Sequence, residues 1–133
     1  MRIKIDNPAL RAIPGIIDRI CDFALETISH PDADKLGECK MILDELLTNI
    51  ISYGFTGRTD GWVQADASVK DGALYVTLTD NGILFDPLAW DSRPEDFDEE
   101  GGLGIHLARQ MSDGMTYKVD QGYNQLRIVK VIC

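Results

Sequence analysis

Residues 101–108 read Gly-Gly-Leu-Gly-Ile-His-Leu-Ala, with three glycines placed where the apolar residues return to helical spacing. Glycines at the start of a helix leave its first backbone N–H groups accessible, and these groups attract the oxygens of a phosphate. A flexible entry to an amphipathic helix would need the same glycines. Two familiar nucleotide-binding motifs are absent from the sequence: Gly-x-x-x-x-Gly-Lys-Ser/Thr, and Gly-x-Gly-x-x-Gly after a first strand. The stretch therefore favours phosphate binding of another kind.

Upstream, residues 79–87 read TDNGILFDP and follow an apolar segment, 73–79, that predicts a strand. Asp80 would stand at a pocket mouth, where its carboxylate can accept a hydrogen bond from an amine. Gly82 would allow a close backbone approach. The same residues are also typical of an ordinary Asp-Asn-Gly turn. Between the two stretches, residues 81–102 combine glycine, proline and many acidic residues, a composition typical of a functional lid or a mobile segment.

A third stretch, residues 44–51, reads DELLTNII inside a segment whose apolar spacing predicts a helix capped by Asp32 or Asp34. Glu45 and Asn49 are four residues apart, so their side chains share one helix face. An acid beside an amide can supply a general base and an oxygen ligand for a hard cation such as Mg²⁺. Such polar pairs are also common on solvated helix faces, so the pair alone leaves both interpretations open.

The other elements complete a β-α-α-β-β-loop-α-β-β order. Apolar periodicity predicts strands at 2–6, 62–69, 73–79, 115–120 and 125–132, and helices at about 10–29, 32–54 and 103–111. This order implies an α+β protein: a two-layer α/β sandwich with a mixed, mostly antiparallel sheet and helices on one face. The length of 133 residues fits a single domain, 1–133.

The composition restricts the possible partners. Acidic residues exceed basic ones by 22 − 13 = 9, and no Lys/Arg cluster is present, which disfavours direct binding of nucleic acid or an anionic membrane. A nucleotide is not disfavoured, because backbone N–H groups can hold its phosphates. Three widely spaced cysteines indicate reduced thiols, and no apolar run is long enough for a membrane span. We therefore expect a cytoplasmic protein.

The order of the three stretches is what makes them specific. Glu-x-x-x-Asn on a helix, Asp-x-Gly after a strand and Gly-x-Gly before a helix resemble the N box and the two glycine boxes of the GHKL ATPase superfamily. That superfamily unites gyrase, the heat-shock chaperone ATPase, histidine kinases and the mismatch-repair protein MutL, and the similarity covers essentially the whole chain. The longer strings DNGILFDPL and GGLGIHLARQMSD, with Tyr and Asn-x-Leu near the end, look like its anti-sigma serine-kinase branch, the RsbW/SpoIIAB-like regulators.

The resemblance implies the Bergerat ATP-binding fold, with ATP and Mg²⁺ as cofactors. In this comparison Glu45 would be the general base that activates a partner's hydroxyl, Asn49 would bind Mg²⁺, and Asp80 would hydrogen-bond the adenine amine. Gly82 would admit the base. The lid and the helix start would wrap the phosphates through a further set of residues: Gly101, Gly102, Leu103 and Gly104.

Three positions depart from the wider superfamily. Leu84 stands where the superfamily has a second glycine, as is common in the regulator branch. Residues 124–126 read NQL in place of a terminal Gly-x-Thr box, which leaves the residue behind the adenine unassigned. Tyr53 stands where many relatives carry His and receives no role.

The resemblance also implies a serine/threonine protein kinase that acts on an anti-anti-sigma (STAS-like) antagonist, sequesters a sigma factor or similar regulator, and can form a homodimer. A second hypothesis is a non-catalytic module that uses ATP only to set its shape. The presence of both Glu45 and Asn49 favours the enzyme, because a pure binder needs no base. A third is the detached ATPase lobe of a two-component sensor, which is weakened by the lack of a phosphoacceptor helix hairpin.

Overall fold

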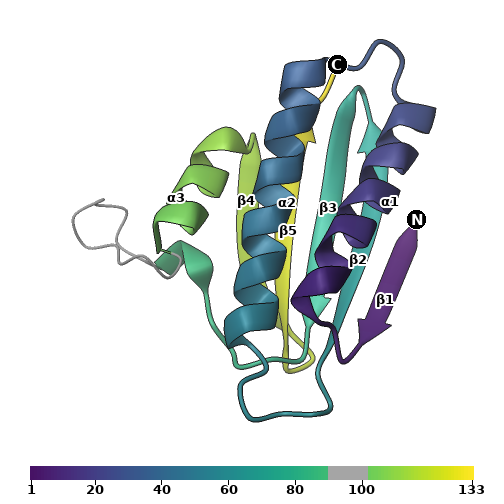
Figure 1. Ribbon diagram of the computed structural model, residues 1–133. Helices are drawn as coiled ribbons and strands as arrows, with labels where there is room; N and C mark the ends of the chain where they lie inside the picture. The colour runs from purple at the N-terminus through teal and green to yellow at the C-terminus, as the bar shows by residue number, and fades with distance from the viewer. Residues whose placement is uncertain (90–101) are drawn as a thin grey trace.

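The structure, a computed structural model, describes residues 1–89 and 102–133, without the side-chain surroundings of residues 102 and 103. Most of the predicted lid, together with Gly101, lies outside these residues. The elements run in the order β1 (Arg2–Asp6), α1 (Ile13–Thr27), α2 (Ala33–Tyr53), β2 (Trp62–Lys70), β3 (Ala73–Asp80), α3 (Gly102–Met111), β4 (Gly114–Asp120) and β5 (Tyr123–Val131). Short 3-10 turns, η1 (Leu10–Ala12) and η2 (Pro87–Ala89), precede α1 and follow β3 (Figure 1).

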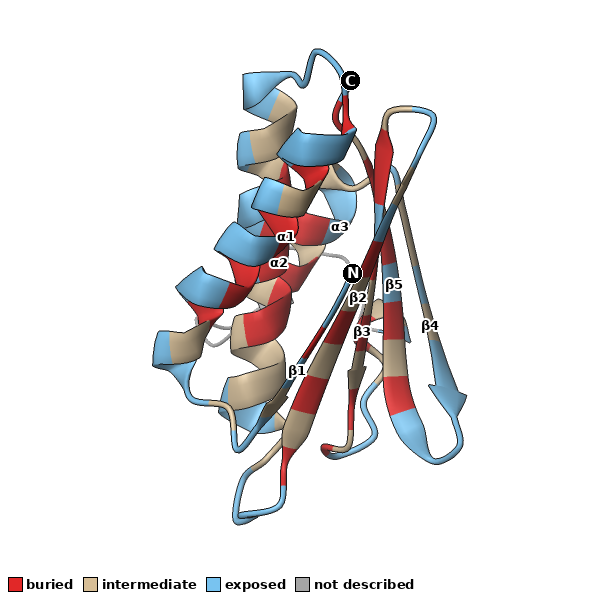
Figure 2. Ribbon diagram, turned by 90° about the vertical axis from the view of Figure 1, so that its right-hand side faces the viewer, coloured by how far each residue is buried: buried red, intermediate tan, exposed pale blue. Residues whose placement is uncertain are grey.

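The strands form one five-stranded sheet in the order β1-β2-β3-β5-β4. The sheet was expected to be mixed and mostly antiparallel; every pairing between the described strands is antiparallel. Figure 2 shows the three helices on one side of this sheet, so the two-layer sandwich is confirmed. Because β5 lies between β3 and β4, the strand that closes the chain runs beside the strand that ends at Asp80.

The helix boundaries follow from local chemistry. Asp32 is the residue that caps α2, because its Oδ1 accepts hydrogen bonds from the backbone N–H groups of Asp34 at 2.9 Å and Lys35 at 3.1 Å. Such a cap satisfies N–H groups that have no partner inside the helix. The segment predicted as a helix from residue 10 instead begins with the η1 turn, and α1 itself starts at Ile13.

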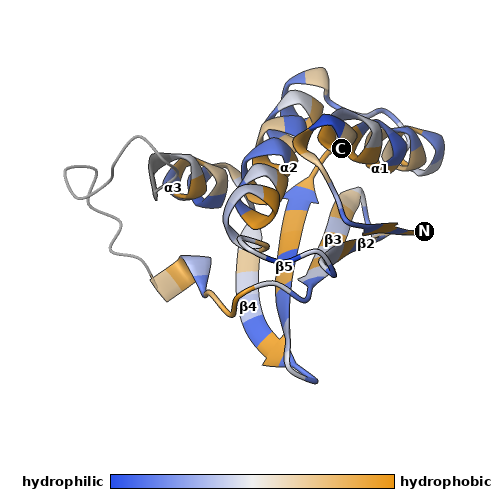
Figure 3. Ribbon diagram, turned by 60° about the horizontal axis from the view of Figure 1, so that its bottom comes forward, coloured by the Kyte–Doolittle hydropathy of each residue, from blue (hydrophilic) through white to orange (hydrophobic). Residues whose placement is uncertain are grey.

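The core lies between the helices and one face of the sheet. Alternate residues of β2, β3 and β5 are buried there against apolar stripes of α1 and α2. Figure 3 shows the same two layers from another side, with hydrophobic and hydrophilic segments alternating along β5. Cys21 and Cys39 are buried free thiols of this core, and burial raises the pKa of Cys39 to about 12. Within residues 1–89 and 102–133, no helix is long and apolar enough to cross a membrane.

Candidate functional site

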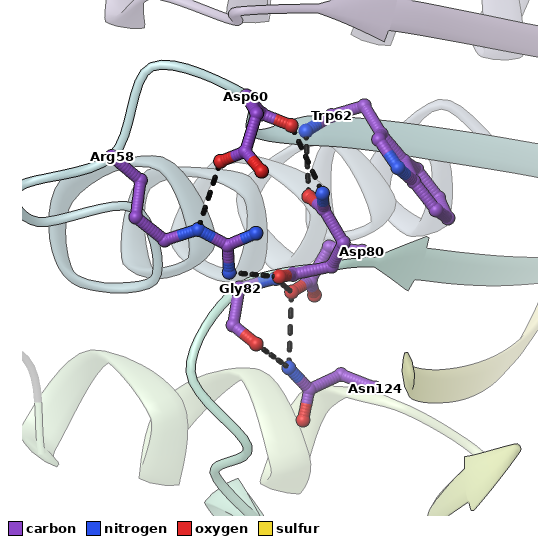
Figure 4. A network of polar contacts seen from close by, with 7 residues as sticks. Arg58, Asp60, Trp62, Asp80, Gly82 and Asn124 are labelled. Carbon is purple, nitrogen blue, oxygen red and sulfur yellow. Dashed lines mark hydrogen bonds and ion pairs between the residues drawn. The ribbon is translucent and has the colours of Figure 1, made fainter. Parts of the chain in front are cut away.

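Asp80 is the last residue of β3, and its side chain is turned into the molecule with only 4% of the residue exposed. Its Oδ1 accepts two hydrogen bonds, from the Gly82 backbone N–H at 2.9 Å and from the Asn124 side-chain amide at 3.0 Å (Figure 4). Asn124 lies directly opposite Asp80 in the β3–β5 register. The antiparallel pairing therefore fixes which atoms meet at this end of the sheet.

Asn124 makes the full set of hydrogen bonds that a side-chain amide allows. Its Nδ2 donates to Asp80 and to the Ile83 carbonyl at 2.9 Å. Its Oδ1 accepts from the Phe85 N–H at 3.1 Å and from the Tyr117 hydroxyl. An asparagine amide offers two donors and one oxygen with two lone pairs, so its orientation here is determined. Asn124 thus holds both the acidic side chain and the loop that follows β3.

Asn124 is a functional residue that the sequence motifs leave without a role. A signal was available, because β5 alternates buried and less buried residues and Asn124 occupies a buried position in line with Leu126 and Ile128. A polar residue on the buried face of a strand needs hydrogen-bond partners. The sequence could not say which partners these would be, since Asp80 is 44 residues away along the chain.

Burial raises the pKa of Asp80, and three weaker influences oppose it: the Asn124 amide, the Gly82 N–H and the positive charge of Arg58. The ionised form is therefore costly unless its charge is met by donors. Among the described residues, Asp80 Oδ2 has no hydrogen-bond partner, whereas Oδ1 has two. A ligand that brings an amine donor to Oδ2 would complete the site.

The turn after β3 is fastened to the loop between α2 and β2 through Asn81. The Asn81 side chain donates to the Asp60 carbonyl at 2.9 Å and accepts from the Trp62 N–H at 2.8 Å. Arg58 donates to the Asn81 carbonyl and binds the Asp60 carboxylate at 3.1 Å. Figure 4 shows this network beside the contacts of Asp80. The Asp-Asn-Gly turn is thus braced from the side opposite Asn124.

Gly82 has a structural reason of its own to be glycine. A Cβ at Gly82 would lie 2.7 Å from the Gly54 carbonyl oxygen and 2.9 Å from Asp80 Oδ1, closer than real Cβ contacts occur. The next residue, Ile83, donates its N–H to the same Gly54 carbonyl at 2.9 Å. The close approach predicted at Gly82 is therefore an approach to the C-terminal end of α2, and whether a ligand also uses it stays a prediction.

The second part of the site lies further back along α2. Glu45 and Asn49 are both half-buried on this helix, and α3 packs against it. A Cβ built on Gly104, in the first turn of α3, would lie 2.0 Å from Glu45 Oε2. The carboxylate of Glu45 therefore touches the start of α3. Glu45 and Gly104, which the sequence placed in separate motifs, are brought together here.

The helix α2 connects the two parts. Its C-terminal end meets the Asp80–Gly82 turn through Gly54, and Glu45 meets α3 nine residues earlier, an axial distance of about 14 Å at 1.5 Å per residue. Asn49 lies between them on the same helix. Across the described residues, no group of three or more His, Cys, Asp or Glu side chains could hold a metal ion. A magnesium ion at Asn49 would need further ligands from a bound phosphate or water.

Comparison with known proteins finds a matching family model and several similar sequences. A family model described as a histidine kinase-like ATPase domain matches residues 8–130. The anti-sigma F factor of Clostridium botulinum is 28% identical over 92 residues, covering 64% of this chain and 62% of the relative. The serine-protein kinase RsbW of Listeria monocytogenes is 27% identical over 97 residues, covering 67% of this chain and 62% of the relative.

A solved structure shows the same fold. The catalytic domain of the histidine kinase ThkA superposes with a TM-score of 0.58 at 12% identity, covering 99% of this chain and 97% of the other. By contrast, this chain spans 62% of the length of the two relatives found by sequence. An antiparallel sheet covered on one side by helices is thus common to this chain and the catalytic domain of a histidine kinase.

Proposed function

The chain belongs to the histidine kinase-like ATPase family, and we propose that within it this protein binds ATP with Mg²⁺ and phosphorylates a serine or threonine of a partner protein. The observation that carries the proposal is the arrangement along α2. A buried acidic acceptor, Asp80, stands at one end of the site, and Glu45 stands further along the helix at the start of α3. A nucleotide could reach both.

The residues present fit such a ligand. Asp80 Oδ2 is an acceptor suited to the adenine amine, because the other oxygen is already occupied by Gly82 and Asn124. Asn49 presents an amide oxygen of the kind that Mg²⁺ binds. For the phosphates, the proposal keeps the residues that the sequence indicated: Gly101, Gly102, Leu103 and Gly104.

Mg·ATP supplies a γ-phosphoryl group whose negative charge is partly neutralised by the metal. Glu45 receives the proton of the partner's hydroxyl group as the hydroxyl oxygen bonds to phosphorus. ADP is the leaving group, so the products are a phosphorylated partner and ADP. Asp80, which Asn124 holds in place, would fix the other end of the nucleotide, and this would keep the reacting atoms close.

The partner class is proposed from the two relatives named as an anti-sigma F factor and a serine-protein kinase. We expect an anti-anti-sigma (STAS-like) protein as the phosphoacceptor and a sigma factor as a second partner. Phosphorylation adds up to two negative charges at the contact. The chain already carries a net charge of −9, so the phosphorylated partner should be repelled and released.

The test uses ATP labelled at the γ-phosphate, Mg²⁺ and candidate antagonist proteins encoded next to this gene. Label on the partner that survives acid indicates phosphoserine or phosphothreonine and supports the proposal. Acid-labile label indicates phosphohistidine and favours the sensor-lobe hypothesis. If ATP raises the melting temperature of the protein but no partner is labelled, the non-catalytic module is correct.

The proposed switch has a separate test, a pull-down with the phosphorylated and unphosphorylated partner at low salt. We expect the unphosphorylated form to bind more tightly and added salt to reduce the difference, because salt screens the repulsion. Equal binding of both forms at low salt would rule out the switch even if ATP binding were confirmed.

A further inference from the structure

Gly104, which the sequence assigns to the phosphates, also lies against the carboxylate of Glu45. A Cβ at position 104 would lie 2.0 Å from Glu45 Oε2 and 2.8 Å from its Cδ, and both distances are too short for real Cβ contacts. Either α3 or the Glu45 side chain would have to move. Which of the two yields depends on how firmly α3 is held.

Two sets of contacts hold α3 against α2. Ile105 and Ala108 are buried, with 4% and 0% exposed, so retreat of the helix would open the core. At the other end of α3, Lys130 Nζ donates to the Met111 carbonyl at 2.7 Å and to Glu38 Oε2 on α2 at 2.5 Å. Lys130 is itself a buried residue, with 6% exposed. These contacts resist a shift of α3, so we expect the flexible end of Glu45 to move instead.

We propose that Gly104 is a positioning residue for Glu45: the missing side chain leaves the space in which the carboxylate is held. The contact itself does not depend on the proposed function, but its catalytic meaning does, since it takes Glu45 as the general base. A side chain at 104 would push Oε2 by about 1 Å or more before the contact became acceptable. A misplacement of about 1 Å can cost on the order of 10²-fold in rate.

The first experiment measures the contact without any substrate. Gly104→Ala is made in the wild-type protein and in Glu45→Ala, and melting temperatures are compared. Gly37→Ala is the matched control, since Gly37 lies on α2 and an added Cβ there meets nothing within 4 Å. Alanine is the better helix former, so the control should raise the melting temperature by roughly 3–6 °C.

Gly104→Ala should give a similar gain only when Glu45 has been removed. In the wild-type background the gain should be smaller, because the carboxylate must be displaced. A gain of the same size in both backgrounds would mean that the two residues do not compete for space, and the proposal would be wrong.

The second experiment separates binding from transfer. Alanine at position 104 keeps the backbone N–H that would meet the phosphates, so Gly104→Ala should lower kcat for phosphorylation of the partner about 10²-fold while the Kd for ATP changes by less than about threefold. Glu45→Asp withdraws the carboxylate by one methylene, so it should cost less in Gly104→Ala than in the wild type. If Gly104→Ala weakens ATP binding as much as it slows transfer, the glycine acts on the phosphates and not on Glu45.

The two experiments distinguish failure of the proposed kinase function from failure of the positioning role of Gly104. A wild-type protein that transfers no phosphate contradicts the proposed function, yet the melting temperatures still decide whether Gly104 and Glu45 share space. Conversely, active wild-type protein with no coupling between the two residues leaves the kinase in place and removes the positioning role.

Discussion

The two ends of the site are built in different ways. At the end of β3, Asp80 and Asn124 are buried, with 4% and 6% exposed, and the strand register sets them opposite each other. At the other end, Glu45 and Asn49 are half-buried side chains on α2, and the Glu45 carboxylate lies against Gly104 in the first turn of α3. The first end is fixed by backbone pairing and a complete set of hydrogen bonds, and the second by van der Waals contact. Changes at the first end should therefore alter both nucleotide binding and stability, whereas changes at the second should slow phosphoryl transfer more than they weaken nucleotide binding.

Removal of the proposed base should give the largest effect. Glu45→Ala should reduce phosphoryl transfer to the partner by about 10²–10⁴-fold, the contribution of a positioned general base. The rise in melting temperature on addition of Mg·ATP should persist, because Asp80 is untouched. The neighbouring Asp44→Ala is the control, since Asp44 is exposed on the same helix. Equal losses of phosphoryl transfer in the two variants would contradict the role of Glu45 as the base. Loss of the ATP-dependent rise in melting temperature in Glu45→Ala would contradict the assignment of nucleotide binding to the Asp80 end.

The next effect is expected on nucleotide affinity. In Asp80→Asn the side-chain oxygen can still accept from Gly82 and Asn124, so the fold should survive. Its NH₂ group would then face the adenine amine, donor against donor. Loss of one hydrogen bond to a charged group costs about 1.5–3 kcal/mol, so the Kd for ATP should rise roughly 10- to 150-fold.

Isothermal titration of Asp80→Asn with Mg·ATP measures this change, with Asp120→Asn as a control at an exposed strand end. An affinity that stays the same in Asp80→Asn would remove Asp80 from the adenine site. If Asp80→Asn fails to fold, the hydrogen bonds with Gly82 and Asn124 need the negative charge of Asp80 and not only its acceptor oxygen.

Asn124 should matter mainly for stability. Asn124→Ala removes the partner of the Asp80 carboxylate and of the Ile83 carbonyl, and a buried polar group left without its partner costs about 1–3 kcal/mol. Gln125→Ala is the matched control on the same strand, because Gln125 Oε1 is buried without a partner among the described residues. Urea unfolding should show a clear loss for the first variant and little for the second. Equal losses in the free energy of unfolding would mean that the hydrogen bonds of Asn124 do not contribute to stability.

The smallest effect is a pH dependence that belongs to Asp80. Burial raises its folded-state pKa above the ordinary value of 3.8, so the folded protein holds this proton more tightly than the unfolded chain. The resulting stabilisation is complete below about pH 4 and is lost as the pH rises through the folded pKa. Asp80→Asn lacks this titration, so its free energy of unfolding relative to wild type should increase from pH 4 to pH 7.

Urea unfolding of the wild type and of Asp80→Asn from pH 4 to pH 7 measures the difference in their free energies of unfolding. The contributions of the other carboxylates largely cancel in this difference. A difference that falls with rising pH would show the opposite balance, in which the Asn124 and Gly82 donors stabilise the carboxylate more than burial opposes it. The end of the site at β3 would then favour a charged Asp80 even without a ligand.

Local sequence patterns predicted most of the fold because helices and strands depend on neighbours in the chain. The periodicity of the apolar residues gave three helices and five strands close to their observed bounds, and Asp32 was one of two cap candidates. The η1 turn was missed because its residues continue the helical spacing. The sheet was expected to include parallel pairs, but strand order depends on contacts between distant segments, which a periodic pattern does not specify.

The sequence by itself determined the family, because a helix with Glu45 and Asn49, an acid at a strand end and a glycine cluster before a helix follow one another in the order of a histidine kinase-like ATPase. The roles of these residues in a site stay a prediction. Only the tertiary structure decided that Asn124 holds Asp80, that Gly82 meets the end of α2, and that Gly104 makes room for Glu45. Each of these is a contact between residues far apart in the chain. A motif records which residues are present at short spacing, whereas packing and strand register determine which atoms share the same space.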